Sequence, residues 1–430
     1  MSSATDTAAP ASRLPGLGES LPYFSQTGCI YLDWNATTPV FPEVAEAMRP
    51  YLTAFGNPSS AHAYGRPCNE AVDLARRQVA AMVGAEPGEV HFTSCGTEAD
   101  AWAIWGAVMA ARKRHGNGVL PHVVSSCIEH PAVVETLASL AAQGLLTHTA
   151  VPVNEEGLVS PADVAAAIRP ETVLVTVMHS NNEVGSVQPI AELAALARER
   201  GVLMHSDAAQ SLGKVAVDVK ELGVDMLTIV GHKFGAPKGV AALYIRQGVQ
   251  IERLLCGGGQ EFGRRAGTES VLLLVGLGTA AAIVSRELPA TAAHMAALRD
   301  SLQEQLLAGL PAGTARVNGP AEPAARLPNT LSIGIAGIQA STLLAELSDR
   351  LAASAGAACH SNGGAVSAVL RAMGVPTQPA LGTLRLSVGR HTTQADVDAA
   401  AQMILDYVKR HQGQQGAAGG QQHQQNGAAT

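Results

Sequence analysis

Short apolar runs alternate with longer amphipathic stretches along most of the chain. Runs rich in Val, Ile and Leu predict strands at residues 90–93, 122–126, 173–178, 203–206, 226–230 and 241–245. Apolar positions at helical spacing between them predict helices, among them 66–83, 97–114 and 189–200. Strands that are apolar throughout and separated by helices indicate a mostly parallel sheet covered on both faces. The expected fold class is therefore α/β.

The pattern changes after residue 285. A helix, a strand, a second helix and a second strand are predicted at 291–308, 329–335, 341–353 and 383–388. They indicate a smaller α/β domain over 286–411, beside a large domain over 46–285. We expect the segment 29–45 to pack on the small domain. The apolar run from Val271 to Val284 is too short to span a bilayer and predicts a buried helix.

Both ends of the chain differ from the rest in composition. Residues 1–28 contain no apolar signal core, and residues 412–430 are nearly all Gln, Gly, Ala, His and Asn. Neither end has the apolar content that a folded core requires, so we expect two disordered tails. The first tail holds a single arginine, Arg13, and matches a mitochondrial transit peptide poorly. A cytosolic protein is expected, with a plastid or a mitochondrion as the alternatives.

Composition narrows the class of partner. Of the 430 residues, 47% are hydrophobic and 15% are charged, and the net charge is −7. This balance is typical of a globular enzyme and gives no reason to expect nucleic acid or a membrane as a partner. The six cysteines form no CxxC pair, so we expect a reducing compartment and no metal site.

Polar clusters follow five of the predicted strands. Because ligands of parallel sheets gather at the carboxyl ends of the strands, five such clusters indicate one shared pocket. The clusters lie at 94–98, 129–130, 181–183, 207–210 and 231–233.

Lys233 and Asp207 carry the central chemical hypothesis. A buried lysine after an apolar strand is able to form a Schiff base, although a lone lysine here would more often be solvated. An aspartate at the end of the preceding strand could pair with a protonated pyridine nitrogen, the arrangement that makes pyridoxal 5′-phosphate an electron sink. The alternative role for Asp207 is a helix N-cap.

The remaining clusters suit the other parts of such a cofactor. Thr97 opens a helix whose free N–H groups could hold a phosphate, and His232 could add a hydrogen bond. His130 could stack on a planar ring or shuttle protons, and Gln210 and Asn182 could bond the phenolic oxygen. Capping is the alternative role for Thr97, Gln210 and Asn182, and a position in the protein core is the alternative for His130.

Two residues of the small domain point to a substrate. Cys359 lies in a loop of small residues next to His360, a setting that favours a reactive thiol over a buried inert one. Arg385 is a charge within an apolar strand and needs an anionic partner. That partner is either a substrate carboxylate or a structural carboxylate.

Taken in order, these motifs resemble the cysteine desulfurase and selenocysteine lyase family, from about residue 30 to 410. The resemblance rests on Asp33-Trp34-Asn35-Ala36-Thr37-Thr38-Pro39, Gly56-Asn57-Pro58-Ser59-Ser60, Thr93-Ser94-Cys95-Gly96-Thr97-Glu98, Asn181-Asn182-Glu183-Val184-Gly185, Asp207-Ala208-Ala209-Gln210 and Gly231-His232-Lys233. It implies a fold-type-I pyridoxal phosphate enzyme with a mostly parallel, seven-stranded type of sheet.

The resemblance also implies a role for each candidate residue. Lys233 would hold the cofactor, Asp207 would pair with the ring nitrogen, and His130 would stack on the ring. Gln210 and Asn182 would lie near the phenolic oxygen, with Thr97 and His232 on the phosphate. These assignments agree with the chemistry of the residues themselves.

Three further roles come from the resemblance alone. Thr268 would reach the phosphate from the second subunit of a homodimer. Arg385 would bind the substrate carboxylate with Asn35 nearby, and Cys359 would meet the departing sulfur or selenium. The expected partners are an amino-acid substrate and an acceptor protein for selenium or sulfur.

Departures from the family pattern bear on the substrate. Desulfurases usually have a serine at the position of Val230, and the family usually has Asn-Asn where this chain has Asp100-Ala101. Val230, the motif around Cys359 and Leu386-Ser387-Val388-Gly389-Arg390 favour a selenocysteine lyase that releases alanine and selenide. The main alternative is a cysteine desulfurase, although the loop after Cys359 has the length of bacterial-type desulfurases.

Other classes also stay open. A kynureninase-like lyase and an aminotransferase share the fold, but the Cys359 loop argues against both. A non-catalytic scaffold for sulfur-transfer partners would not need Lys233, Asp207, Arg385 and Cys359 together.

Overall fold

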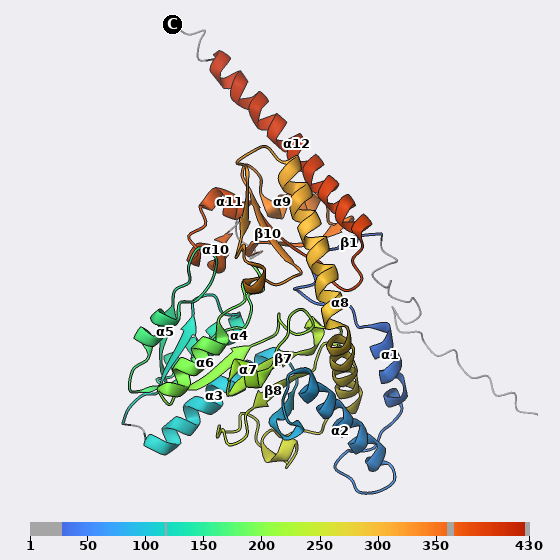
Figure 1. Cartoon of the computed structure of the whole chain (residues 1–430), viewed down its shortest axis with the longest axis vertical. Helices are drawn as coiled ribbons and strands as arrows, with labels where there is room; N and C mark the ends of the chain where they lie inside the picture. Colours follow the sequence, from blue (N-terminus) through green and yellow to red (C-terminus); the bar gives the residue numbers. More distant parts are fainter. Residues whose placement is uncertain (1–27, 117, 359–364, 426–430) are drawn as a thin grey trace, which may run out of the picture.

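A seven-stranded sheet forms the larger part of the computed structural model, which describes residues 28–116, 118–358 and 365–425 (Figure 1). Strands β3 to β7 run parallel to one another, and β8 lies antiparallel between β2 and β7. In spatial order the strands are β2 (Val90–Thr93), β8 (Ala241–Ile245), β7 (Met226–Val230), β6 (Leu203–Asp207), β5 (Thr172–Thr176), β3 (His122–Ser126) and β4 (Thr147–Val151). The predicted α/β fold with a mostly parallel sheet is confirmed.

Successive residues of the central strands enter two separate cores. Val124 and Leu227 pack on one face of the sheet, and their neighbours Val123 and Met226 pack on the other. Side chains alternate across a strand, so an apolar strand fills a core on each face. This double burial is the physical reason for the continuous apolar runs in the sequence.

Helices cover both faces of the sheet. The face of Val124 packs against helices α2 (Gly65–Met82), α6 (Ile190–Glu199) and α8 (Val271–Gly309). The face of Val123 packs against α3 (Gly96–His115) and α4 (Pro131–Ala142). Shorter helices complete this part of the chain: α1 (Pro42–Met48), α5 (Pro161–Ala167) and α7 (Val219–Leu222).

The smaller part is built on a four-stranded antiparallel sheet with a core of its own. Its strands, in spatial order, are β12 (Ser354–Ala355), β15 (Thr383–Ser387), β10 (Thr330–Ile335) and β9 (Ala315–Asn318). Around it lie α9 (Ala340–Glu346), α10 (Ala368–Ala372), α11 (Thr377–Leu381), α12 (Gln394–Gln425) and the pair β13 (Ala357–Ala358) and β14 (Ala365–Val366). The N-terminal strand β1 (Ile30–Tyr31) pairs in parallel with β11 (Leu351–Ala352).

Helix α8 joins the two parts of the molecule. It runs through Pro289 without ending, so that Leu277 lies in the core of the large sheet and Leu302 in the core of the small one (Figure 1). Among the described helices it alone is long and apolar enough to cross a membrane by length and composition. A helix buried in a protein core meets the same criteria, and both halves of α8 contribute core residues.

The structure differs from the predicted elements in several places, among them the single helix α8, where two helices were predicted, and the unpredicted strand β9. Strand β4 was missed, because alternate residues of this edge strand are only partly buried and its apolar pattern is weak. The helix predicted at 341–353 ends at Glu346, and strands β11 and β12 follow it. Helix α12 continues to Gln425, past the predicted start of a C-terminal tail. The division into domains stays a prediction.

We predict that Leu302→Ala destabilises the protein by about 2–5 kcal/mol, because it leaves a cavity in the small core where Leu302 is fully buried. Urea unfolding followed by circular dichroism measures the change. The matched control is Leu307→Ala on the same helix, where the side chain is 43% exposed and the loss should be much smaller. Equal losses in the two variants would contradict the assignment of Leu302 to the core.

Candidate active site

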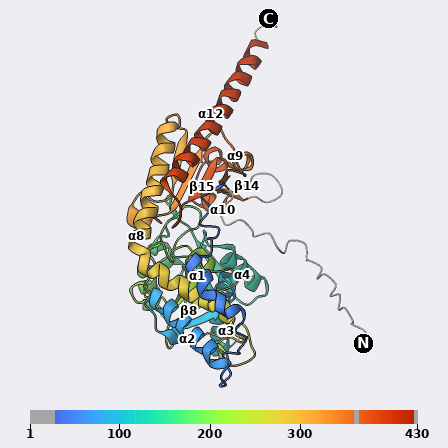
Figure 2. The ribbon, with the colours of Figure 1, turned by 90° about the vertical axis from the view of Figure 1, so that its right-hand side faces the viewer.

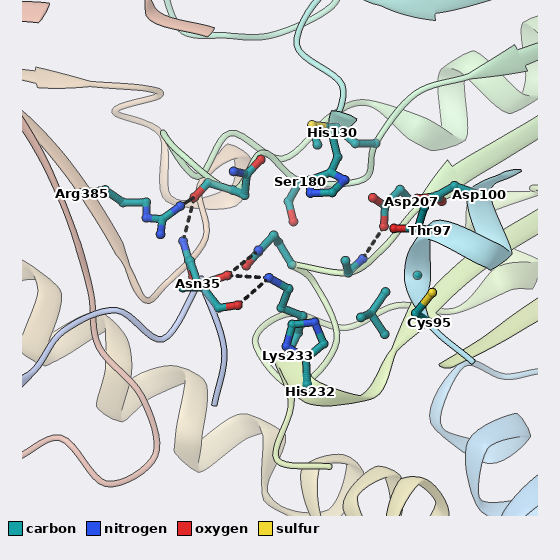
Figure 3. A pocket seen from close by; sticks show the side chains of 17 residues that line it. Asn35, Cys95, Thr97, Asp100, His130, Ser180, Asp207, His232, Lys233 and Arg385 are labelled. Atoms are coloured by element: carbon teal, nitrogen blue, oxygen red, sulfur yellow. Dashed lines mark hydrogen bonds between the residues drawn. The ribbon is translucent and has the colours of Figure 1, made fainter. Parts of the chain in front are cut away.

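A pocket of about 290 Å³ lies at the carboxyl ends of β2, β3, β5, β6 and β7 (Figure 3). The structure brings all five predicted polar clusters to it, and Asn35 and Arg385 enter from the N-terminal segment and from β15. The predicted site residues that line it are Asn35, Thr97, His130, Asn182, Asp207, Gln210, His232, Lys233 and Arg385.

Lys233 ends a short 3₁₀ turn, Gly231–Lys233, directly after β7. Its Nζ donates hydrogen bonds to the backbone carbonyls of Asn35 at 2.8 Å and Ala36 at 2.9 Å. Burial and the nearby Arg385 guanidinium lower the pKa of Lys233 to about 8, against the opposing pull of Asp207. A lysine with this pKa supplies a neutral, nucleophilic amine close to physiological pH.

Asp207 and His130 stand at the far side of the pocket from Arg385 (Figure 3). Asp207 Oδ1 accepts the Ala209 N–H at 2.9 Å, and His130 Nδ1 accepts the Ala132 N–H at 3.1 Å. Burial lowers the pKa of His130, so the neutral ring carries its proton on Nε2. His130 thus caps α4, Asp207 bonds the turn that follows β6, and both residues also line the pocket.

The N-terminus of α3 forms the end of the pocket near Thr97. A Cβ on Gly96 would lie 2.6 Å from Cγ2 of Val230, so glycine allows the helix to start against the end of β7. His232 is held through Nδ1 and the Thr37 hydroxyl at 3.1 Å, and burial lowers its pKa to about 4. This end thus offers backbone N–H groups, one hydroxyl and a neutral imidazole to an anion.

Lys214 is a site residue that the sequence analysis missed. Its Nζ donates to Oε1 of Gln210 at 2.8 Å and to Oδ1 of Asn35 at 3.1 Å. Because Oε1 is occupied, Gln210 directs its amide N–H groups toward the site, where Nε2 bonds the Asn35 carbonyl at 2.9 Å. The sequence places Lys214 four residues after the 207–210 motif, which could have marked it as a candidate. Only the tertiary structure shows that Lys214 is buried.

Arg385 has both a structural partner and open donor positions. Its Nη2 bonds Asp33 Oδ1 at 2.7 Å and Ser354 Oγ at 2.8 Å, and its Nη1 bonds the Asn182 carbonyl at 3.2 Å. Its Nε is buried and has no hydrogen-bond partner in the described structure. The structural ion pair that we considered for Arg385 is present, and the donors facing the pocket stay available for a carboxylate.

One predicted residue, Thr268, does not line this pocket. Thr268 lines a separate cavity of about 210 Å³, in a loop that the Arg265–Glu98 ion pair ties to α3. Cys359 lies outside the described residues. In the described ranges, no three His, Cys, Asp or Glu side chains are grouped so as to hold a metal ion.

The donor set fits pyridoxal 5′-phosphate. Lys233 offers an amine for the aldehyde, Asp207 a buried carboxyl for the ring nitrogen, and the start of α3 an anion site for the phosphate. Burial raises the pKa of Asp207, so its ionised form needs a cation beside it, and a protonated ring nitrogen is one. The arrangement is that of a pyridoxal phosphate enzyme.

Sequence comparison places the chain in a defined family. A model of the family "Aminotransferase class-V" matches residues 30–400, and the chain belongs to this family. The predicted cofactor, pyridoxal 5′-phosphate, is confirmed by this membership and by the related proteins below.

Related proteins cover nearly the whole chain. A cysteine desulfurase IscS from Methanosarcina thermophila is 43% identical over 388 residues, which are 90% of this chain and 93% of that protein. A solved NifS-like protein is 35% identical with a TM-score of 0.81, covering 89% of this chain and 99% of its own. A structure of SspA in complex with cysteine is 34% identical with a TM-score of 0.72, covering 84% and 99%.

We predict that the apoprotein takes up pyridoxal phosphate faster as the pH rises, with the rate levelling off above about pH 8. Only the neutral Lys233 amine attacks the aldehyde, and its pKa is about 8. Stopped-flow absorbance between pH 6 and pH 10 measures the rate, and the exposed Lys238→Ala variant serves as the control. A rate that keeps rising to pH 10 would indicate an ordinary lysine and contradict the low pKa.

Proposed function

We propose that this protein is a pyridoxal-phosphate-dependent cysteine desulfurase, which converts L-cysteine to L-alanine and passes the sulfur to Cys359. The main observation that supports this proposal is that Lys233, Asp207 and Arg385 line one pocket. Support comes from relatives of 41–44% identity that are named cysteine desulfurases, and from the related structure that contains cysteine.

This proposal corrects our preference for selenocysteine lyase. That preference rested on three short segments: Val230, the motif around Cys359, and Leu386-Ser387-Val388-Gly389-Arg390. The similarity to named cysteine desulfurases extends over about nine-tenths of the chain. Similarity of that extent outweighs three local motifs.

Some residues of the pocket bind the substrate, and others transfer protons. The bound cofactor supplies an electron sink for the carbon framework of the substrate. Arg385 binds the substrate carboxylate, and Asp33 and Ser354 hold the guanidinium in place. The Lys233 amine, when it is free, would take the proton from Cα of the substrate. The Nε2–H of neutral His130 faces the same space.

The sulfur step conserves atoms and electrons. The Cys359 thiolate attacks the substrate sulfur, so that an S–S bond forms and the substrate C–S bond breaks. The electron pair stays on carbon, which takes up a proton and becomes the methyl group of alanine. Cysteine and the Cys359 thiol thus give alanine and a Cys359 persulfide, and a sulfur acceptor protein or a thiol then removes the sulfur.

We also infer a homodimer, in which Thr268 of each chain approaches the phosphate end of the other chain's pocket. In a single chain Thr268 is absent from its own pocket, in keeping with such a contribution. The phosphate would then be held by Thr97 and His232 of one chain and by the hydroxyl of a second chain.

The direct test gives the purified holoenzyme L-cysteine and L-selenocysteine side by side and measures alanine and chalcogenide. We expect turnover of cysteine with a persulfide on Cys359, loss of that persulfide and of cysteine turnover in Cys359→Ala, and near-normal activity in Cys256→Ala. Cys256 is an exposed cysteine outside the pocket.

Selenocysteine lyase is the second candidate, because Val230 places an apolar side chain where a serine would offer a hydroxyl. Turnover of selenocysteine with cysteine nearly inert would reject the desulfurase and support this candidate. No alanine from either substrate would reject both.

We predict that Arg385→Lys raises the KM for cysteine about 10- to 100-fold, with a smaller change in kcat. A lysine cannot reproduce the planar fork, and a hydrogen bond to a charged group is worth about 1.5–3 kcal/mol. Steady-state alanine formation measures both constants, with the exposed Arg350→Lys as the control. An unchanged KM would mean that Arg385 serves only its ion pair with Asp33.

A further inference from the structure

A second buried carboxyl lies beside Asp207 at the same end of the pocket. Asp100, on the first turns of α3, is 1% exposed, and Asp207 is 6% exposed. Both line the pocket, and Figure 3 shows them together at the end away from Arg385. Two carboxyls that share a buried site cannot both ionise without a large electrostatic cost.

The surroundings of Asp100 offer hydrogen bonds but no counter-charge. The Thr228 hydroxyl bonds its carboxyl, whereas Oδ1 is buried without a hydrogen-bond partner among the described residues. The nearest basic group is Nε2 of His205, 3.7 Å from Oδ1. Burial lowers the pKa of His205 to about 3, so that ring is neutral.

His205 is itself held by neutral groups. Its Nδ1 meets the Thr176 hydroxyl at 2.8 Å and its Nε2 the Thr228 hydroxyl at 3.0 Å, and all three side chains are fully buried. His205, Thr176 and Thr228 are all neutral, so none of them supplies a positive charge that would stabilise an ionised Asp100. The acidic neighbour Asp207 opposes a charge on Asp100 further, whereas burial raises the pKa of the other nearby carboxyl, Glu129, to about 8.

Asp207, unlike Asp100, has a positively charged neighbour that stabilises its ionised form. The Ala209 N–H donates to Asp207 Oδ1 at 2.9 Å, and the Lys233 ammonium favours the negative charge of Asp207. Burial raises the pKa of both carboxyls. A neutral hydroxyl, that of Thr228, opposes this rise at Asp100, whereas a backbone N–H and the nearby Lys233 ammonium oppose it at Asp207. A proton shared between the two therefore resides on Asp100.

We propose that Asp100 is a positioning residue that stays protonated at neutral pH, so that the carboxyl pair holds one negative charge, on Asp207, for the ring nitrogen of the cofactor. The proposal rests on pyridoxal phosphate as the cofactor but not on which amino acid is the substrate. It assigns Asp100 the task of keeping its neighbour the single anion at that end of the pocket.

The proposal has a consequence for stability with a defined sign. The folded-state pKa of Asp100 lies above its unfolded value of about 4. Asp100 therefore costs the folded state nothing below pH 4, and its cost grows as the pH rises toward the folded pKa. Between the two pKa values, each pH unit lowers the folding equilibrium constant tenfold relative to a variant with a neutral group at this position.

The first experiment compares the full-length holoenzyme with Asp100→Asn, an isosteric neutral substitution. Urea unfolding is measured from pH 5 to pH 8, with the exposed Asp163→Asn as the control. We expect the stability of Asp100→Asn relative to the native protein to rise by about tenfold in equilibrium constant per pH unit, and Asp163→Asn to show no such slope. A difference that is constant with pH would mean a merely structural role and overturn the proposal.

The second experiment tests the pairing with Asp207. In an Asp207→Asn background the repulsion on Asp100 is gone, so the pH-dependent gain from Asp100→Asn should shrink. Infrared spectra of the native holoenzyme at pH 7.5 should contain a protonated carboxyl band that Asp100→Asn loses, whereas Asp163→Asn loses only carboxylate absorbance. An undiminished gain in the double variant, or the loss of a carboxylate band in Asp100→Asn, would overturn the proposal.

Neither the pH dependence of stability nor the infrared carboxyl band requires a substrate. A protein that fails as a desulfurase could still show the carboxyl band and the pH slope, and an active desulfurase could lack both. The outcome for Asp100 is therefore separate from the outcome for the proposed function.

Discussion

The buried side chain and backbone of Asn35 hold the two halves of the site together. Its carbonyl accepts from Lys233 and Gln210, and its Oδ1 accepts from Lys214 and Asn329. Its Nδ2 donates to Asn182 and Thr330, and its backbone N–H donates to Ser387. With the side chain 1% exposed, each of these groups must find a partner within the protein, and each does.

The full set of hydrogen bonds that Asn35 makes within the protein limits how it can contact the substrate. Asn35 was predicted to lie near the substrate carboxylate, and it does line the pocket with Arg385. As the structure stands, no hydrogen-bonding position of Asn35 is open, so a bond to substrate requires one protein partner to leave. Lys233 is the partner that would leave, because a lysine bound to the cofactor would no longer donate to the Asn35 carbonyl. A direct contact between Asn35 and substrate stays a prediction.

The pocket separates its charges in space. Arg385 lies at one end, Asp207 and Asp100 lie at the other, and Lys233 stands between them (Figure 3). An amino acid and pyridoxal phosphate present the matching pattern, with a carboxylate at one end and a basic ring nitrogen at the other. Figure 2 shows the part built on the large sheet and the part built on the small sheet one above the other, with α8 running along both. Arg385 belongs to the small part, whereas Lys233 and both aspartates belong to the large one.

The sequence by itself determined six of the seven strands of the central sheet, their mostly parallel arrangement and the polar clusters at their ends, because continuous apolar runs and the residues that follow them are local features. It also indicated the cofactor, since the lysine and aspartate motifs carry that chemistry in short segments. Tertiary structure alone decided that Arg385 pairs with Asp33, that Lys214 bonds Gln210 from a buried position, and that Asp100 faces Asp207. The continuous course of α8 through Pro289 was decided in the same way. In each case, the outcome depends on burial and on partners distant in the chain, which no local pattern records.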